Sequence, residues 1–268
     1  MGLIELEHVS FSYDGEERKV LSDISLSIEK GTFLSVIGHN GSGKSTFSRL
    51  LNGLLIPTSG KVLVDGLDTA NRKNLKEIRR KVGVVFQNPD NQIVSDTVEE
   101  DTAFAPENLG LGRKEISERV ERSLLAVGLI DKRYDNPNEL SGGEKARLSL
   151  AGILAMDPEV LVLDEVTAML DLDGRNRIME ILQDLKAQGK TIIFITHHTE
   201  ETLSSDRLII FRNGSVIQDG KPGNVYSSPV DPSIPLPFAS RLALRLKERG
   251  MDMFEGAVTL EDLGGVRC

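Results

Sequence analysis

Residues 38–46 limit what this chain can fold into more than any other stretch. They match the pattern G-x-x-x-x-G-K-[ST] in full, after an apolar run at 32–37 that predicts a buried strand and before an amphipathic run at 47–55 that predicts a helix. Glycines let the backbone curve, so that successive N–H groups converge on an anion at the positive end of a helix. This context favours a phosphate-binding loop over a plain glycine-rich turn. The loop comprises Gly38, His39, Asn40, Gly41, Ser42, Gly43, Lys44, Ser45 and Thr46.

Two side chains of this loop carry its chemistry. Lys44 is placed to reach the β and γ phosphates of a nucleotide, and the Ser45 hydroxyl is placed to bind Mg²⁺. The alternative, a lysine that only faces solvent from a structural turn, does not explain why both the spacing and the context match.

Two acidic residues follow a second apolar run. Residues 160–163 predict a buried parallel strand, and Asp164 and Glu165 come at its carboxyl end, where open α/β sheets bind their ligands. Asp164 is suited to hold Mg²⁺ through water, and Glu165 to activate an attacking water. Two acids that merely end a strand remain the alternative.

Other buried strands also end in polar side chains. The run 82–86 leads into Gln87, and the run 191–196 leads into His197 and His198. Because the carboxyl ends of parallel strands meet at one edge, we expect Gln87 and His197 beside Glu165. His197 is then expected at the γ-phosphate and His198 at the surface, although a histidine at a strand end is often only a structural group.

A second glycine-rich turn reads Ser141, Gly142, Gly143 and Glu144. Ser141 and Glu144 have the spacing of a capping box, so a plain helix start is the simplest interpretation. Consecutive glycines in a first turn are costly, at about 1 kcal/mol each relative to alanine, and a cap does not need them. They favour close approach by another surface, and bare N–H groups suit a second phosphate.

The remaining chain predicts an α/β fold with additions. Segments 4–7 and 24–28 alternate like antiparallel strands, and Tyr13 lies in a turn between them, equally suited to packing and to covering an adenine ring. Residues 96–129 read as helices inserted into the strand–helix alternation. A hairpin is expected at 208–218, a proline-rich linker at 222–237 and a last helix at 238–249.

Composition excludes several classes of protein. With 32 basic and 41 acidic residues, the net charge of −9 argues against a nucleic-acid partner. The one cysteine, Cys268, rules out an internal disulfide framework, and we expect no secretory signal at the start. No apolar stretch is long enough to cross a bilayer, so work at a membrane would need another subunit.

Taken together, these motifs resemble the ATP-binding cassette (ABC) ATPases. The likeness covers residues 3–225, and the Leu-Ser-Gly-Gly-Glu sequence at 140–144 is its most specific part. It implies a P-loop NTPase (RecA-like) core with an antiparallel β subdomain, a helical subdomain at about 88–157 and a C-terminal extension at 226–268. It also implies two cassettes arranged head to tail. Each ATP would then lie between the phosphate loop of one cassette and residues 140–144, the signature sequence, of the other. The residue roles that it implies are adenine stacking for Tyr13, sensing of Mg²⁺ and water for Gln87, general base for Glu165, contact across the dimer for Asp171 and γ-phosphate contact for His197.

A finer resemblance covers residues 86–104, 167–171 and 242–250. It is to the A1-type and cobalt-importer ATPases of energy-coupling factor importers for vitamins and metals. This implies a paralogous or identical second cassette, a transmembrane coupling subunit, a substrate-binding membrane component and a place at the cytoplasmic face of the membrane, with the last segment helping to dimerise the cassettes. Departures from the family pattern are Ala146, Val166 and Leu172. None of them removes a group that carries chemistry, although Ala146 is expected to weaken contacts near the dimer interface.

Two alternatives stay open at this point. One is a soluble cassette protein that acts on ribosomes or nucleic acid, although such proteins commonly carry two cassettes and basic additions. The other is a regulatory module that binds nucleotide without hydrolysis, which Glu165 and His197 disfavour. If the chain couples to a membrane subunit, acids between 87 and 107, with Glu100 and Asp101 foremost, are expected to pair with arginines on it.

Overall fold

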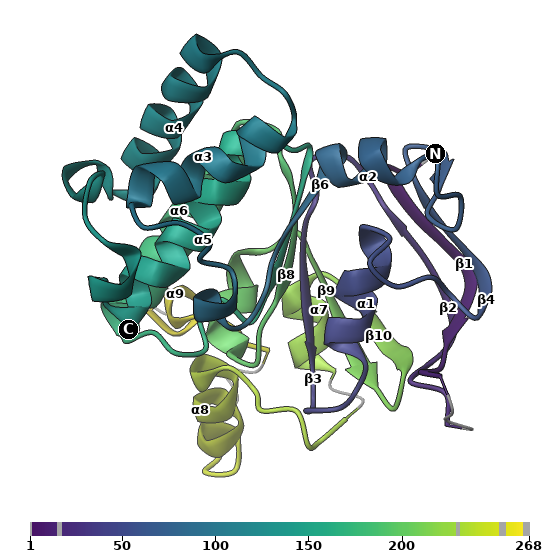
Figure 1. The fold of residues 1–268 in the computed structure, drawn as a ribbon. Coiled ribbons are helices and arrows are strands. Elements are labelled where there is room, and N and C mark those ends of the chain that lie inside the picture. The colour runs from purple at the N-terminus through teal and green to yellow at the C-terminus, as the bar shows by residue number, and fades with distance from the viewer. Residues whose placement is uncertain (1, 15–17, 229–230, 252–255, 265–268) are drawn as a thin grey trace.

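The structure is a computed structural model that describes residues 2–14, 18–228, 231–251 and 256–264. Cys268 and parts of the expected C-terminal extension therefore fall outside the described residues. The described chain contains two sheets, with helices between them and around them (Figure 1). The strands are β1 Ile4–Phe11, β2 Leu21–Ile28, β3 Phe33–Gly38, β4 Ser59–Val64, β5 Leu67–Asp68, β6 Val82–Val85, β7 Val160–Asp164, β8 Thr191–Ile195, β9 Arg207–Arg212 and β10 Ser215–Gly220. The α-helices are α1 Lys44–Leu51, α2 Leu75–Lys81, α3 Val98–Asn108, α4 Arg113–Val127, α5 Gly142–Met156, α6 Leu172–Ala187, α7 Pro222–Ser227, α8 Phe238–Lys247 and α9 Leu260–Gly264. Short 3₁₀ helices are η1 Pro89–Asn91, η2 Ile130–Lys132, η3 Pro137–Glu139 and η4 Thr199–Ser204.

The central sheet has the strand order β10-β9-β3-β8-β7-β6. Strands β9, β3, β8, β7 and β6 run parallel, and β10 pairs antiparallel with β9. Every residue of β6, β7 and β8 is buried, which explains why these strands read as continuous apolar runs instead of alternating ones. Their shared direction brings the residues after β3, β6, β7 and β8 to one edge.

A smaller antiparallel sheet faces the central one across helix α1. Its order is β2-β1-β4-β5, and the expected strands at 4–7 and 24–28 are the first half of β1 and the last part of β2, which pair with each other. One hydrophobic cluster joins both sheets to α1 through Phe47, Leu50 and Leu51. Because α1 is held on both sides, the loop that enters it is anchored to both sheets (Figure 1).

Helices α3, α4 and α5 form a layer at the other side of the central sheet. The apolar stripe of α4 is buried through Val120, Leu124 and Val127, at the spacing that the sequence predicted. These residues pack in a second cluster with α5, α6 and the strands β7 and β8. The helical insertion is therefore packed onto the core through α5.

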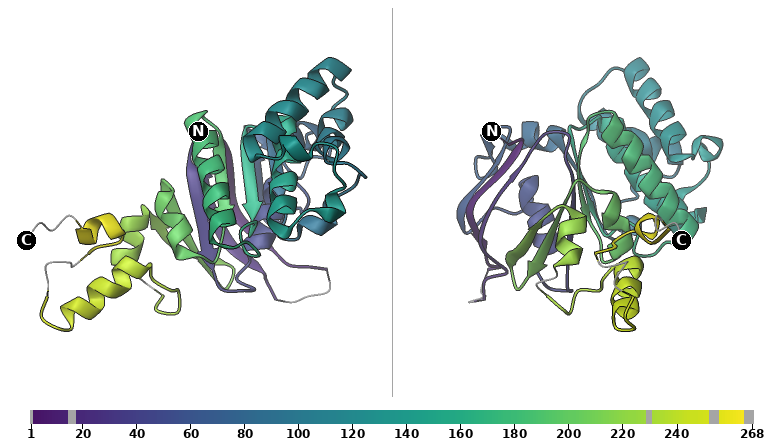
Figure 2. Two further views of the ribbon diagram at one scale, coloured as in Figure 1. Left: turned by 90° about the vertical axis from the view of Figure 1, so that its left-hand side faces the viewer. Right: turned by 180° about the vertical axis from the view of Figure 1, so that it is seen from behind.

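The C-terminal part begins with a helix that the sequence did not predict. The proline-rich stretch contains α7, whose Val225 and Tyr226 are buried against β9 and β10, so it is not only a linker. Helices α8 and α9 contact each other at the opposite end of the molecule from α3 and α4 (Figure 2). None of the helices that the structure describes has the length and apolar character needed to span a lipid bilayer.

Candidate functional site

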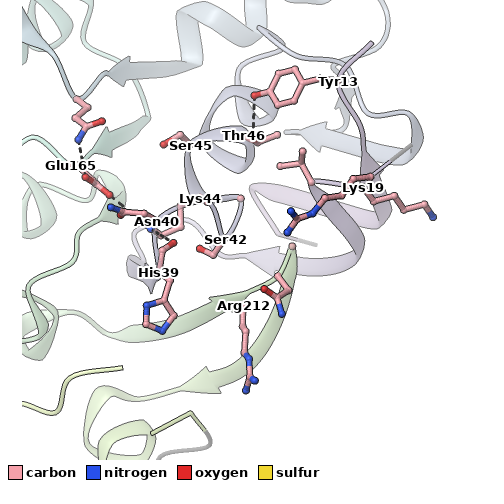
Figure 3. Close-up of a pocket in the computed structure, with 17 residues that line it drawn as sticks. Tyr13, Lys19, His39, Asn40, Ser42, Lys44, Ser45, Thr46, Glu165 and Arg212 are labelled. Carbon is pink, nitrogen blue, oxygen red and sulfur yellow. Dashed lines mark hydrogen bonds and ion pairs between the residues drawn. The ribbon is translucent and has the colours of Figure 1, made fainter. Parts of the chain in front are cut away.

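An open cleft of about 740 Å³ lies at the carboxyl edge of the central sheet (Figure 3). The phosphate loop forms its floor, Tyr13 one rim, and Gln87 and Glu165 the side toward the sheet. The turn between β9 and β10 closes the remaining side, with Arg212 projecting from it. This last wall could not be predicted from the loop and strand motifs, because it comes from a hairpin far along the chain.

The glycines of the loop are required by its path. Gly43 has φ 106°, and a Cβ there would come within 2.6 Å of Leu21 Cδ2. At Gly38 a Cβ would lie 2.3 Å from the Phe211 carbonyl oxygen. Helix α1 starts at Lys44 instead of near 47, so its first turn belongs to the loop and points its N–H groups into the cleft.

Lys44 is held at the loop by its backbone carbonyls. The side chain is 5% exposed, and Nζ donates hydrogen bonds to Gly38 O at 2.8 Å and His39 O at 3.1 Å. The Glu165 carboxylate lies 3.8 Å from the same nitrogen. Burial lowers the pKa of Lys44, while the charges of Glu165 and Asp164 oppose that shift. A buried ammonium of this kind gains strongly from an anion in the cleft.

Asp164 and Ser45 meet behind the loop. Ser45 Oγ donates to Asp164 Oδ1 at 3.2 Å, and Ser48 Oγ donates to Oδ2 at 3.3 Å. Burial raises the pKa of Asp164, and the Ser45 hydrogen bond opposes that shift. One hydroxyl beside one buried carboxylate fits Mg²⁺, which keeps several waters and takes its other oxygens from phosphates. Among the described residues, no three His, Cys, Asp or Glu side chains gather into a metal site of their own.

Glu165 lies close to the polar side chains that follow the two neighbouring strands. Gln87 Nε2 donates to Glu165 Oε2 at 3.0 Å, and His197 Nδ1 lies 3.9 Å from the same oxygen. The backbone of Glu165 is left-handed, with φ 54°, a conformation that costs a non-glycine residue free energy and that five other described residues, such as Asp157 and Asn213, also adopt. The structure thus brings together Gln87, Glu165 and His197 as the parallel strands predicted, whereas the left-handed turn had no sequence signal.

A second pocket of about 750 Å³ adjoins the cleft beyond Glu165 and His197. Ser233, Ile234 and Pro235 line it, so the segment 231–237 reaches the nucleotide side of the fold. His39 Nε2 and Ser233 Oγ lie 2.7 Å apart, and Ile234 is buried in one cluster with Ile37 at the end of β3. Sequence reasoning missed these contacts because nearly 200 residues separate the partners.

The signature turn lies outside the cleft. Ser141, Gly142, Gly143 and Glu144 are described, and none of them lines it. Ser141 and Glu144 form a full capping box at the start of α5, and Lys132 Nζ lies 2.6 Å from Glu144. The hydrogen bond from Lys132 and that from the Ser141 backbone hold the pKa of Glu144 at about 2. Gly142 instead lines a separate pocket of about 260 Å³ with Met169 and Leu170.

Three other expected residues have mixed positions. Tyr13 packs edge-on against Phe11, and its hydroxyl lies 3.1 Å from Thr46 Oγ1, so the packing alternative is observed. The ring also borders the cleft, where covering an adenine stays a prediction. Asp171 is exposed and caps α6 by accepting from Gly174 N at 2.8 Å. His198 is half-buried beside Arg175, not at the surface as expected.

The acidic residues between 87 and 107 differ in burial and in ion pairing. Asp101 is 8% exposed and accepts a hydrogen bond from Val94 N at 2.7 Å, so its expected role toward a membrane partner is wrong. Asp90 pairs with Lys145 and Glu99 with Arg133. Within the described chain, the exposed acids of this segment for which no ion pair is seen are Asp96, Glu100 and Glu107.

Comparison with known proteins agrees with this geometry. Residues 21–168 match the model of the ABC transporter family. The energy-coupling factor transporter ATP-binding protein EcfA1 of Caldanaerobacter subterraneus subsp. tengcongensis is 46% identical over 99% of each chain. EcfA1 of Clostridium perfringens (strain 13 / Type A) is 44% identical over 99% of this chain and 98% of its own.

Solved structures agree as well. The structure of cbiO1 from Clostridium perfringens, part of the ABC transporter complex cbiONQ, has a TM-score of 0.80 and 34% identity over 94% of this chain and 98% of its own. A dimeric ATP-binding cassette in a post-hydrolysis state, bound to ADP and Pi, has a TM-score of 0.75 and 31% identity over 82% of this chain and 98% of its own. The fold is therefore that of the P-loop cassettes, and this chain belongs to the ABC transporter family as an ATPase of the energy-coupling factor type.

Proposed function

We propose that this chain hydrolyses ATP to power the uptake of a vitamin or a transition-metal ion by an energy-coupling factor importer. The observation that carries this proposal is the convergence of Lys44, Gln87 and Glu165 on one cleft, with His197 in the adjoining pocket beside Glu165. The chain also matches transporter ATPases over almost its full length. A role on ribosomes or nucleic acid finds no support among these relatives. A regulatory module that binds nucleotide without hydrolysis is disfavoured by Glu165 and His197, which lie together at this edge of the sheet.

In this mechanism Glu165 is the general base. Gln87 fixes one carboxylate oxygen, so that the other oxygen is free to orient a water in line with the γ-phosphate. Lys44 moves from its loop carbonyls to the β and γ phosphates, and His197 donates to a γ-phosphate oxygen. Phosphoryl transfer mainly needs positioning and compensation of charge, which these side chains supply.

Ser45, with Asp164 behind it and Gln87 beside the cleft, would hold Mg²⁺ with ATP. When bound, Mg²⁺ offsets negative charge on the phosphates. Asp164 accepts the Ser45 hydrogen bond and so fixes the rotamer of that hydroxyl toward the loop. Tyr13 covers the adenine from the rim of the cleft.

We further propose that two cassettes share each ATP. Residues 141–144 and Asp171 of one copy lie away from their own cleft, which supports a role opposite the phosphate loop of a second, identical or paralogous cassette. The bare N–H groups of the first turn of α5 would meet the γ-phosphate there. The likeness to a dimeric cassette supports this arrangement.

The partners at the membrane are a transmembrane coupling subunit and a separate substrate-binding membrane component. The chain would bind peripherally at the cytoplasmic face through them. Residues 3–225 serve as the nucleotide-binding domain, with the helical subdomain at about 88–157 toward the membrane. The extension at 226–268 stabilises the pair of cassettes, and exposed Phe238 and Leu244 on α8 support a contact there.

Co-purification tests this proposal. The tagged chain is expressed in its own host, extracted in mild detergent and isolated with its partners. We expect a polytopic membrane protein and a second cassette in stoichiometric amounts, with ATPase activity in the complex. Recovery of the chain with ribosomes or nucleic acid, and with no membrane subunit, would contradict it.

A further inference from the structure

A buried glutamate, Glu201, has no part in the mechanism above. It lies in η4, which follows β8 and the pair His197 and His198, and is 9% exposed. Burial raises the pKa of its carboxyl group, and two hydroxyl hydrogen bonds oppose that shift. Its Oε1 has no hydrogen-bond partner among the described residues. Burying a carboxyl group in this way costs free energy of folding, so a plain packing role does not account for it.

The other oxygen of Glu201 accepts from two buried threonines. Thr196 Oγ1 donates to Glu201 Oε2 at 2.5 Å, and Thr167 Oγ1 donates to the same atom at 3.0 Å. Both threonines are 1% exposed, so water does not compete for these hydroxyls. The contacts are therefore short, dry and directed at one acceptor.

Each threonine belongs to a different catalytic segment. Thr167 lies two residues after Glu165, and Thr196 directly precedes His197. The strands β7 and β8 are hydrogen-bonded neighbours, but their backbone pairing ends near Glu165 N and Ile195 O. Glu165 is thus still joined to Ile195 through the backbone, whereas Thr167 and His197 lie past that hydrogen bond. Side-chain contacts between the two segments therefore help to set where His197 lies relative to Glu165.

A second tie runs parallel to the first. Arg175 Nε donates to Leu170 O at 2.9 Å, and its guanidinium lies 3.3 Å from His198 Nδ1. It also joins the segment after β7 to the segment after β8. Arg175 is only half-buried, however, so the Glu201 contacts are the more shielded from water.

We propose that Glu201 is a positioning residue for ATP hydrolysis. Its Oε2 clamps Thr167 to Thr196 and so holds Glu165 and His197 at the separation that the reaction needs. This inference rests on the proposed roles of Glu165 and His197. Because the clamp does not touch the nucleotide, its loss lowers kcat and leaves the KM for ATP nearly unchanged.

Matched threonine variants of the full chain, assayed in its purified transporter complex, test the clamp. Thr167→Val keeps shape and burial but removes the hydroxyl, and Thr167→Ser keeps the hydroxyl. Thr202→Val is the control. Thr202 is a fully buried threonine of η4, the 3₁₀ helix that contains Glu201, but its hydroxyl bonds Tyr226 and Thr199 instead. Thr167→Val is used first because Glu201→Ala leaves two buried hydroxyls unpaired and risks misfolding.

We expect Thr167→Val to lower kcat roughly 10- to 100-fold with KM changed less than about two-fold, and Thr167→Ser to restore most of it. Thr202→Val should lower the melting temperature as much as Thr167→Val does, with a normal kcat. Glu201→Gln keeps an acceptor oxygen and should fall between wild type and Thr167→Val.

Two results would overturn the clamp. One is a wild-type kcat in Thr167→Val, and the other is an equal loss of kcat in Thr167→Val and Thr202→Val, which would mean that stability alone sets the rate. The proposed role of Glu165 is tested separately. A Glu165→Gln variant that still hydrolyses ATP at the normal rate would show that Glu165 is not the general base. An inactive Glu165→Gln beside a fully active Thr167→Val would refute only the clamp.

Discussion

The side-chain amide of Gln87 donates a hydrogen bond to the Glu165 carboxylate across 3.0 Å, although the two residues follow different strands of the central sheet. Strands β6 and β7 are parallel neighbours, so the residues that follow them leave the sheet side by side. The contact turns Glu165 Oε2 toward Gln87 and leaves Oε1 nearer to Lys44, at 3.8 Å. One carboxylate thus links the segment after β6 to the phosphate loop.

Replacement of Glu165 by glutamine should separate binding from hydrolysis. The amide keeps the size of the side chain but cannot take a proton from water, so we expect kcat to fall at least about 100-fold while ATP still binds. Phosphate release and equilibrium nucleotide binding measure the two effects. Glu159→Gln is the control, since Glu159 precedes the same strand at its other end, and a comparable loss there would argue against a specific role.

Tyr13 should contribute through its ring face more than through its hydroxyl. Removing the ring in Tyr13→Ala is expected to raise the KM for ATP roughly ten-fold, since stacking on a base is worth about 1–3 kcal/mol. Tyr13→Phe loses only the contact with Thr46 and should change KM by about two-fold. Inhibition by tripolyphosphate, which has no base, should be the same in both variants. Equal KM values in Tyr13→Ala and Tyr13→Phe would show that the adenine does not stack on this ring.

Glu144 should make the free energy of unfolding depend on pH in the acidic range. Its pKa is about 2 in the folded chain against an ordinary 4.5, so its charge stabilises the fold above pH 4.5. That contribution is lost as the pH falls from 4.5 toward 2, when the folded state must take up the proton.

Glu144→Gln can retain the cap but loses the ion pair with Lys132. We expect it to be less stable than wild type by about 1 kcal/mol at pH 7, with a difference that shrinks near pH 3. Urea unfolding at the two pH values measures this. Glu139→Gln, at an exposed site just before the signature, should follow wild type at both. A gap that stays constant with pH would show that charge is not the cause.

Charge reversal at Glu100 and Glu107 should uncouple transport from hydrolysis. Both are exposed acids on α3, and a partner helix rich in arginine would be repelled by lysine there. We expect uptake to fall about ten-fold in Glu100→Lys/Glu107→Lys, within the usual range of coupling free energies, while basal ATPase activity is kept. Asp184→Lys, on the exposed side of α6, should leave uptake intact. Asp101 is avoided because its burial makes a lysine there a folding defect. Normal uptake in the double variant would contradict this contact.

Local sequence predicted the parts of the site that depend on local physics. The phosphate loop, the strand at 160–164 and the cap of Ser141 each follow from neighbouring residues, whose spacing fixes backbone geometry. The meeting of Gln87, Glu165 and His197 could also be predicted, because parallel strands share an edge.

The rest depends on packing between distant segments. The clamp on Glu201 joins residues 34 positions apart, and its acid looked like one of several in a polar turn. The burial of Asp101 was hidden in an acidic run, because its backbone partner Val94 lies in a loop. The short helix α7 forms in a proline-rich stretch because Val225 and Tyr226 find an apolar surface, and no local pattern reveals that surface.

The position of Ser233 and Ile234 beside the phosphate loop limits where this chain can be truncated. A deletion that ends the chain after β10 would look like a clean cut between cassette and appendage, yet it would open the wall next to Glu165 and His197. It would also uncover Ile37, on the strand that leads into the loop. The first part of the extension therefore supports the nucleotide-binding domain, and a shortened chain should keep the residues up to 237.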